Sequence, residues 1–468
     1  MKRIIPLLSL LSVSSVFHAS MLPVPARAQQ PLDIPVVTIA SSPSPVGSGA
    51  RAAGMGSAFI AIADDATAAS WNPGGLVQLE RPEISAVGAV FQRIEDFSDD
   101  PRARGDLSNS TTTASLNYLS VAYPFRLFSR HVVVSLNYQQ LLDFNRSLGF
   151  RLSQDQRPFL EFSQELDFEQ TGAVYALSPA FSVEITPRLS LGVAVNIWMD
   201  DLFSDRAWES HTIGTGRGSV GIGTPTDFTT LFRRDETFSG FLGVNVTLGM
   251  LWNVWRGLQI GAVVKTPVRA DANRKLSSSL EVYDPANPGN PPPGVTPSLP
   301  TSLEEEVEIE WPWSLGFGVS YRFSDRWTLS TDLTRVEWAD FTITQTDPAT
   351  GERIETSPIT GAPAAESDVD ATYTVRLGTE YLFLLPEKHL AVPVRGGFFY
   401  DPLPSGNGTD DYFGFSLGSG VTLSRVSFDL AYTLRFGRDV LGDLLSGVAD
   451  TQADVVTHRF LFSAIVYF

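Results

Sequence analysis

The sequence predicts a transmembrane antiparallel β-barrel of about 14 strands whose lumen holds a compact N-terminal hatch. Segment after segment alternates apolar with polar or small residues, which is the period of a strand with two unlike faces. Short and long connections alternate along the chain. Aromatic residues make up 11% of the 468 residues although the mean hydropathy is only +0.02, a combination that suits an apolar outer face around a polar interior.

The first element is an export signal, residues 1–28. Lys2 and Arg3 precede the apolar run 4–17, and Ala26-Arg27-Ala28 matches a cleavage site. A signal-anchor helix is the alternative, but the apolar run is short and contains Pro6. Cleavage removes three cations (Lys2, Arg3 and Arg27) and no acid, so the formal net charge changes from -18 to -21.

This composition excludes several classes of function. An acidic chain is a poor partner for nucleic acid, which binds clustered Lys and Arg. The absence of cysteine excludes disulfides and thiolate metal sites. The histidines outside the signal are scattered, at positions 131, 211, 389 and 458, and no nucleophile and base pair stands out. Glycines 49, 54 and 56 lack the strand and the lysine of a phosphate loop. We therefore expect neither an enzyme nor a cofactor.

The second element, residues 29–80, contains the stretch GMGSAFIAIADDATAASWNPGGL, which begins at Gly54. Its small residues permit close packing, its glycines permit tight turns, and Pro73 and the glycines after it turn the chain before the first strand. A barrel of about 14 strands is wide enough to leave a lumen. We predict that residues 29–80 fold inside it as a hatch, whose main residues are Gly54, Gly56, Asp64, Asp65, Trp71, Asn72 and Pro73.

The third element, residues 81–468, is the predicted barrel. In RVSFDLAYTLRF and WPWSLGFGVSYRF every second residue is apolar or aromatic. The uncharged stretch 238–255 is long enough for a membrane helix, but it keeps the period of two and is therefore assigned as a strand. The predicted strands span residues 83–93, 113–124, 131–155, 159–185, 188–199, 237–252, 257–283, 303–323, 326–345, 369–385, 391–400, 412–423, 425–437 and 455–468.

The connections are segregated by length. Short turns are predicted near residues 124–130, 186–187, 253–256, 324–325, 386–389 and 424, and long polar loops include residues 200–236, 284–302 and 346–367. Short turns at one end and long loops at the other are typical of outer-membrane barrels. A soluble protein made of many hairpins is the alternative, but it gives no reason for this segregation.

Strand alternation places six charged side chains in the lumen: Arg322, Arg376, Glu380, Arg395, Asp429 and Arg435. Buried charges require partners. We expect these residues to offer partners to Asp64 and Asp65 of the hatch, the alternative being hydrated charges that do not contact it.

Two further stretches carry predictions. In SLEEEVEIEW, Glu304, Glu306, Glu308 and Glu310 share one face of a strand. They are weak candidates for a divalent cation, which favours carboxylate oxygens, and a solvated strand extension is the preferred alternative. The chain ends HRFLFSAIVYF, and this pattern with terminal Phe468 resembles the signal that the barrel assembly machinery recognises in bacterial outer-membrane barrels.

The phrase GMGSAFIAIADDATAASWNPGGL resembles the N-terminal signature of the FadL family of outer-membrane transport proteins, in which an I-A-D-D-A element precedes an N-P-A motif. VRLGTEYLF, VPVRGGFFYDPLP and FDLAYTLRFG are also similar to that family. Gly74 replaces the usual alanine, and the extension from Gln29 to about Gly47 departs from the family pattern.

The resemblance implies an outer-membrane barrel of a Gram-negative-type bacterium that takes up hydrophobic small molecules, such as long-chain fatty acids or aromatic hydrocarbons, and releases them sideways through its wall. The expected partners are the ligand, outer-membrane lipid and the assembly machinery. The N-terminal phrase also resembles PorV-related barrels, which implies an alternative role as a protein-interaction subunit in secretion.

Overall fold

The computed structural model describes residues 38–39, 44–97, 108–156, 160–202, 206–221, 225–286, 300–346, 350–406, 408–440, 445–446 and 452–468. The predicted signal peptide lies outside these ranges, as does most of the extension before Gly47.

A closed antiparallel ring of fourteen strands forms the barrel, which confirms the predicted fold class. Each strand pairs with its neighbours along the chain, and the last strand pairs with the first from Ala453 opposite Phe97 to Tyr467 opposite Glu83. The ring consists of β3 (Glu83–Phe97), β4 (Ser108–Leu127), β5 (Arg130–Asp143), β7 (Leu160–Thr186), β8 (Leu189–Met199), β10 (Thr226–Trp255), β11 (Leu258–Lys265), β14 (Ser314–Ser324), β15 (Trp327–Val336), β18 (Thr372–Leu385), β19 (Leu390–Tyr400), β22 (Tyr412–Thr422), β23 (Val426–Val440) and β25 (Ala453–Tyr467).

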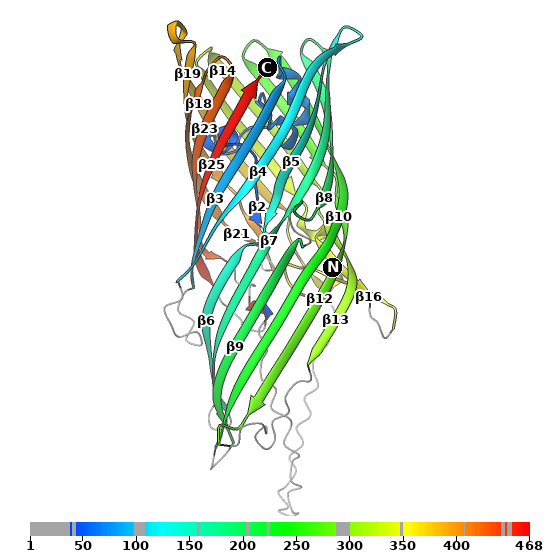
Figure 1. Ribbon diagram of the computed structural model, residues 1–468, viewed down its shortest axis with the longest axis vertical. Coiled ribbons are helices and arrows are strands. Elements are labelled where there is room, and N and C mark those ends of the chain that lie inside the picture. The colour runs from blue at the N-terminus through cyan, green and yellow to red at the C-terminus, as the bar shows by residue number, and fades with distance from the viewer. Residues whose placement is uncertain are drawn as a thin grey trace, which may run out of the picture.

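The two ends of the barrel differ. The tight connections, such as residues 128–129 between β4 and β5, lie at the same end as the C-terminus, at the top of Figure 1. There the Phe468 backbone N–H donates to the Pro82 carbonyl over 3.0 Å and completes the last ladder. The long connections lie at the opposite end. The predicted segregation of loop lengths is therefore present.

The outer face of the ring is apolar. In β10, Leu242 and Leu248 are 57% and 50% exposed on the outside, whereas Gly243 and Asn245 are buried on the inside. Apolar side chains that face outward over a closed sheet are what a bilayer requires. Among the helices of the described ranges, none is long and apolar enough to span a membrane.

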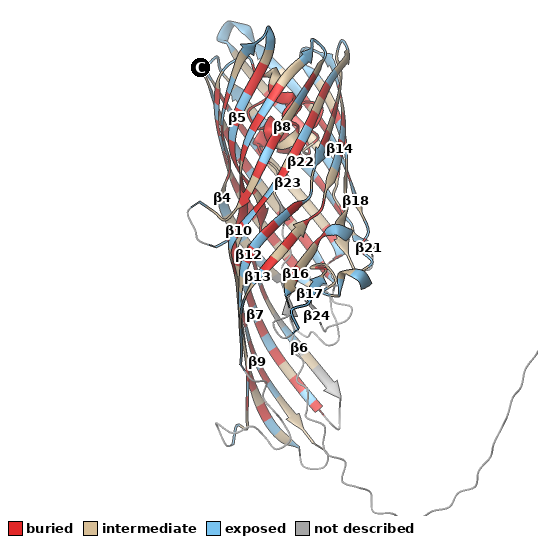
Figure 2. Cartoon of the chain, turned by 90° about the vertical axis from the view of Figure 1, so that its right-hand side faces the viewer, coloured by how far each residue is buried: buried red, intermediate tan, exposed pale blue. Residues whose placement is uncertain are grey.

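On one side the sheet continues past the barrel as an extension that we call the wing (Figures 1 and 2). It consists of β6 (Arg146–Gln156), β9 (Trp208–Val220), β12 (Val268–Tyr283) and β13 (Thr301–Trp311), together with residues 160–172 of β7 and 226–240 of β10. Its outward side chains are charged, for example the exposed Arg233 and Asp235 of β10. The apolar outer band therefore stops where the wing begins, and the wing stands outside the hydrocarbon layer.

The prediction that residues 200–236 form a loop is wrong, because β9 and the start of β10 occupy most of that range. The inward positions of β9 include Gly214, Gly216 and Gly218. A Cβ atom at Gly216 would lie 2.7 Å from the ring of Phe162, and one at Gly218 would lie 2.6 Å from the ring of Phe228. The apolar side chains that cover β9 thus come from its neighbours, and the strand shows no apolar alternation of its own.

The hatch occupies the lumen near the short-turn end, where Figure 1 shows its blue helical turns enclosed by strands. It consists of α1 (Ala50–Gly54), α2 (Ala68–Trp71) and the 3-10 helix η1 (Pro73–Gln78). Almost all of its side chains are small or apolar and buried, as in the cluster formed by Met55, Phe59 and Leu76 with residues of the wall. Helical turns at residues 50–78 match the predicted plug.

The remaining elements are short. They are β1 (Thr38–Ile39), β2 (Ser44–Pro45), β16 (Thr342–Thr346), β17 (Arg353–Thr356), β20 (Leu403–Ser405), β21 (Gly408–Asp410), β24 (Leu445–Ser446), η2 (Trp338–Asp340), η3 (Ala364–Glu366) and η4 (Pro386–Lys388).

Candidate hatch, ligand pocket and wall seam

The hatch backbone lies directly on glycines of the wall. A Cβ atom at Gly378 would lie 2.1 Å from the Met55 carbonyl oxygen, and one at Gly397 would lie 2.1 Å from the Gly56 nitrogen. Similar contacts within 3 Å recur around the ring, at Gly192, Gly249, Gly261, Gly318, Gly378, Gly397 and Gly418. We call these seven glycines the glycine seat. Only residues without a side chain allow the hatch to approach this closely.

Two of the predicted hatch residues shape a tight turn against β22. Gly56 has a φ of 62°, a left-handed conformation that favours glycine. Its N–H donates to the Ser416 hydroxyl over 2.7 Å, and that hydroxyl donates to the Gly54 carbonyl over 3.0 Å. One serine of the wall therefore holds both ends of the turn.

Asn72 and its neighbours fix the end of the hatch. Asn72 is fully buried, and its side-chain oxygen accepts from Gly74 N–H over 3.0 Å at the start of η1. Its amide nitrogen donates to the carbonyls of Ile60 in the hatch and Met250 in β10, over 2.8 and 2.9 Å. Pro73 is the first residue of η1, where proline suits a helix start. The Trp71 indole donates to the Ser48 carbonyl over 2.9 Å.

A chain of ion pairs joins the hatch to the barrel. Arg51 of α1 contacts Asp64 at 2.5 Å and Glu380 of β18 at 3.0 Å. Glu380 in turn lies 2.6 Å from Arg395 of β19, which contacts Asp429 of β23 at 2.5 Å. Three of the six predicted lumen charges are thereby brought together, and Arg51, which the sequence reasoning missed, connects them to the predicted Asp64.

The other predicted charges lie elsewhere. Asp65 accepts hydrogen bonds within the hatch, from the Thr67 N–H at 2.8 Å and the Thr67 hydroxyl at 2.6 Å. Burial, the largest effect, raises the pKa of Asp65, whereas Arg51 and Thr67 act in the opposite direction. Arg322 is exposed near a short turn, and the described residues give it no ion-pair partner. Arg376 and Arg435 line a pocket.

Asp332 of β15 is a second contact that sequence reasoning missed. It is 2% exposed, and one of its carboxylate oxygens accepts from the N–H groups of Phe59 and Ile60 over 2.7 and 2.9 Å. The only available signal was its inward position in a strand that otherwise carries small or neutral residues inside.

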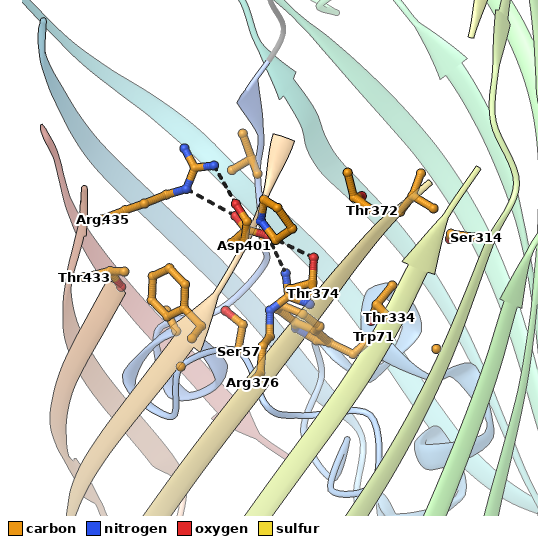
Figure 3. Close-up of a pocket in the computed structure, with 18 of the residues that line it drawn as sticks. Ser57, Trp71, Ser314, Thr334, Thr372, Thr374, Arg376, Asp401, Thr433 and Arg435 are labelled. Atoms are coloured by element: carbon orange, nitrogen blue, oxygen red, sulfur yellow. Dashed lines mark hydrogen bonds and ion pairs between the residues drawn. The ribbon is translucent and has the colours of Figure 1, made fainter. Parts of the chain in front are cut away.

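A cavity of about 330 Å³ lies next to the hatch, on the side that faces the long loops (Figure 3). Hatch residues such as Ser57, Ile60 and Trp71 form part of its lining, and strand residues form the rest. Its aromatic and aliphatic lining includes Trp71, Phe91, Val263, Val336, Trp338 and Phe399, and its hydroxyl lining includes Ser57, Ser70, Ser314, Thr334, Thr372, Thr374, Thr433 and Thr457. The pocket is therefore amphipathic.

The charge of the pocket is predominantly positive. Its lining contains five cations, Arg93, Lys265, Arg376, Arg435 and Arg459, and one acid, Asp401. Asp401 lies 3.5 Å from Arg376 and 3.3 Å from Arg435, as the dashed lines of Figure 3 show. Lys265 is exposed, and no carboxylate in the described part of the chain pairs with it. The arrangement can bind an apolar chain or ring that carries an anionic group.

The wall beside the hatch contains a seam. Backbone pairing between β4 and β5 extends only from Tyr118 opposite Gln139 to Leu127 opposite Arg130. Beyond it, residues 108–117 of β4 pair with β3 alone, and β6 pairs with β7 alone, within the described residues. We call the boundary between residues 108–117 and 140–149 the seam.

Side chains take the place of the missing ladder at the seam. The Asn109 side-chain oxygen accepts from Gly149 N–H over 2.7 Å, and the Thr111 hydroxyl accepts from Ser147 N–H over 2.8 Å. The Ser115 hydroxyl donates to the Gln140 side chain over 2.7 Å. Such contacts can separate without breaking a backbone ladder.

The glutamates of β13 face cations rather than one another. Glu304 lies 3.5 Å from Lys275, Glu308 lies 2.9 Å from Arg353, and Glu310 lies 3.3 Å from Arg269. Glu306 is opposite Asn273. In the described ranges no group of three or more acidic, histidine or cysteine side chains is arranged to hold a metal ion. β13 forms part of the wing, and its residues Thr301, Ser302, Glu304 and Glu306 are exposed.

Comparison with known proteins shows which family and which solved structures this barrel resembles. The sequence profile described as "Outer membrane protein transport protein (OMPP1/FadL/TodX)" matches residues 46–441. A crystal structure of a Pseudomonas aeruginosa FadL homologue is 17% identical, with a TM-score of 0.57 over 92% of this chain and 100% of that one. The Pseudomonas putida toluene transporter TodX is 13% identical, with a TM-score of 0.55 over 90% and 98% of the two chains.

The Ralstonia pickettii toluene transporter TbuX is also 13% identical, with a TM-score of 0.50 over 90% and 98% of the chains. At these identities the structures share the fold alone. No curated protein sequence matches the chain. The family profile covers most of the chain, and the chain therefore belongs to the FadL/TodX family of outer-membrane transport proteins.

Proposed function

We propose that this protein is a passive channel for hydrophobic small molecules that enter from the long-loop side, bind in the pocket above the hatch and leave sideways through the seam. The observation that carries this proposal is that two features occur together: a hatch held tightly inside the barrel, and a seam in the wall where backbone pairing is missing. The glycine seat and the ion pairs of Arg51 hold the hatch across the straight route. The seam offers a second route close to the pocket, because pocket-lining Val46 donates its N–H to the Leu141 carbonyl at the seam.

In this proposal the hatch acts as the gate through small shifts of the segment around Val46 and Gly47, which lies between pocket and seam. An apolar ligand gains about 0.8 kcal/mol for each methylene that leaves water. Transfer from water to the pocket and then to the bilayer is therefore favourable without an energy source. The names of the toluene transporters with the same fold support an apolar ligand class.

The charges of the pocket favour long-chain fatty acids over aromatic hydrocarbons as ligands. An uncharged hydrocarbon leaves Lys265 without an anionic partner, whereas a fatty acid carboxylate supplies one. A charged hydrogen bond contributes about 1.5–3 kcal/mol, and 1.4 kcal/mol corresponds to a tenfold change in affinity. Lys265 therefore distinguishes the two ligand classes.

The test compares the parent with Lys265→Met in cells that lack other fatty acid channels. We expect the variant to bind and take up a labelled long-chain fatty acid roughly tenfold less well, from the lower end of that range, while uptake of a neutral aromatic hydrocarbon is unchanged.

The matched control is Lys275→Met, which removes an exposed lysine on the wing that pairs with Glu304. It should behave as the parent does. Equal losses for both ligands would refute the carboxylate assignment, and a parent that takes up neither ligand would refute the channel itself.

The alternative of a secretion subunit gains no support from the matching family or from these structures, so it is not proposed.

A further inference from the structure

The six short turns are positively charged although the protein as a whole is acidic. They lie at the top of Figure 1 and comprise residues 124–131, 184–189, 253–258, 322–327, 384–390 and 422–427, all of which the structure describes. Together they contain eight cations and three acids, a formal net charge of +5 (8 − 3), whereas the whole chain carries -18. The cations are Arg126, Arg130, Arg188, Arg256, Arg322, Arg326, Lys388 and Arg425, and all of them are exposed.

These cations lack the carboxylate partners that cations have elsewhere on the surface. In the wing, Arg233 lies 3.5 Å from Glu281, and Lys275 lies 3.5 Å from Glu304. Within the described part of the chain, none of the eight turn cations forms an ion pair. Arg130 donates to the Ile185 carbonyl over 2.5 Å and thereby links two turns, but this bond does not neutralise its charge. The positive charge of the turns is therefore available to an anion outside the chain.

Each short turn also carries a large apolar side chain on its surface. Phe128 is 91% exposed and Trp255 is 61% exposed. In every turn an exposed apolar residue lies within three positions of an exposed cation, in the pairs Phe128 and Arg130, Ile185 and Arg188, Trp255 and Arg256, Trp327 and Arg326, Leu385 and Lys388, and Leu423 and Arg425. Aromatic side chains collect where the hydrocarbon layer meets the headgroups. These pairs therefore place the cations at the level of the headgroups.

We propose that the six cations of these pairs form a basic collar that binds the phosphate groups of anionic phospholipids in the membrane leaflet at the short-turn end. The collar consists of Arg130, Arg188, Arg256, Arg326, Lys388 and Arg425. Guanidinium groups match the geometry of phosphate oxygens, and each cation near an anionic membrane surface adds to the attraction. A free phosphate ion offers the same charge, but it lacks the acyl chains that the neighbouring apolar side chains contact. The collar goes beyond the proposed transport function and does not depend on it.

The test measures the thermal midpoint of unfolding of the purified full-length protein in neutral detergent, read from the shift in gel migration on heating. We expect added phosphatidylglycerol to raise the midpoint by several degrees more than phosphatidylcholine does. At about 1 M salt, where charges are screened beyond about 3 Å, the difference should largely disappear. Inorganic phosphate, added at the same phosphate concentration as the lipid, should leave the midpoint unchanged.

The collar variant replaces all six cations: Arg130→Gln, Arg188→Gln, Arg256→Gln, Arg326→Gln, Lys388→Gln and Arg425→Gln. It should lose most of the difference between the two lipids. The matched control removes the same charge from exposed cations on the long-loop side: Arg151→Gln, Arg206→Gln, Arg217→Gln, Arg233→Gln, Lys275→Gln and Arg353→Gln. It should respond to both lipids as the parent does.

Equal effects of the two lipids on the parent would overturn the proposal, and so would equal effects of inorganic phosphate and phosphatidylglycerol. A collar variant that still distinguishes the lipids would also overturn it, because the binding would then lie elsewhere. A loss of the same size in the control would assign the effect to net charge instead of the collar. If the collar variant does not fold, Arg256→Gln/Arg326→Gln should show a smaller loss, and an undiminished lipid response there would count against the collar. None of these measurements involves uptake, so the failure of the collar and the failure of the channel are distinguishable.

Discussion

At the scale of single residues, the wall is adapted to the hatch by the removal of side chains. A methyl group at Gly397 would meet the Gly56 backbone nitrogen at 2.1 Å, and backbone cannot turn aside as a flexible side chain can. Overpacking of this kind costs about 1–3 kcal/mol. A Cβ atom added at Gly88 in β3 would have no heavy atom within 4 Å. Gly88 therefore serves as the control position for Gly397.

We expect Gly397→Ala to lower the thermal midpoint of unfolding and to admit a small hydrophilic dye into membrane vesicles, because the hatch no longer fits its seat. Gly88→Ala should match the parent in both measurements. An unchanged midpoint and no dye entry in Gly397→Ala would show that the hatch adjusts to the added methyl group.

The limits of sequence reasoning are also visible at this scale. Strand alternation indicates which side chains face the lumen, and it identified Glu380, Arg395 and Asp429 as inward charges. It carries no information about which residue lies across the lumen, so Arg51 was missed and Asp64 was assigned no definite partner. Which lumen charges contact the hatch depends on the path of the hatch, and small-residue composition does not specify that path.

At the scale of elements, the alternation of apolar residues predicted most strands of the ring but failed for β9 of the wing. That strand presents glycines inward and is covered by Phe162 and Phe228 of neighbouring strands. The seam was equally hidden, because β4 and β6 are ordinary strands by their sequence. A missing ladder is a property of the relation between two strands, and their separate sequences do not record it.

The seam provides a prediction for this scale. Ser115 and Gln140 face each other across it in the barrel wall, and we expect the variant Ser115→Cys/Gln140→Cys, once oxidised, to bind ligand normally but to release it slowly. Fatty acid uptake should fall severalfold and recover when a reductant is added.

The control joins Glu165 and Thr215, which are already paired in the wing between β7 and β9. Oxidised Glu165→Cys/Thr215→Cys should transport at the parental rate. If the seam crosslink also leaves uptake unchanged, the ligand leaves by another route.

At the scale of the whole molecule, the closed ring of strands and the hatch inside it are structurally distinct parts of the chain. Backbone pairing closes the ring without help from the hatch, and every neighbour in the ring is joined by its own ladder. Removal of residues 46–78 should therefore leave a folded barrel with an open lumen, since fourteen strands enclose more space than their side chains fill.

We expect this deletion to produce a pore that passes small sugars, measured as faster swelling of proteoliposomes than with the parent. The folded state is checked independently by the shift in gel migration on heating. A folded deletion variant that remains impermeable would mean that the wing or the long loops, rather than the hatch, block the lumen.

The glycine seat also restricts how the sequence can change. Its seven positions are spread over more than two hundred residues of the barrel, from Gly192 to Gly418. All of them are constrained by contact with one short N-terminal stretch, the hatch. We expect a chimera of this barrel with the hatch of a distant relative to assemble poorly unless the glycines of the wall coincide with the places where the new hatch backbone touches it.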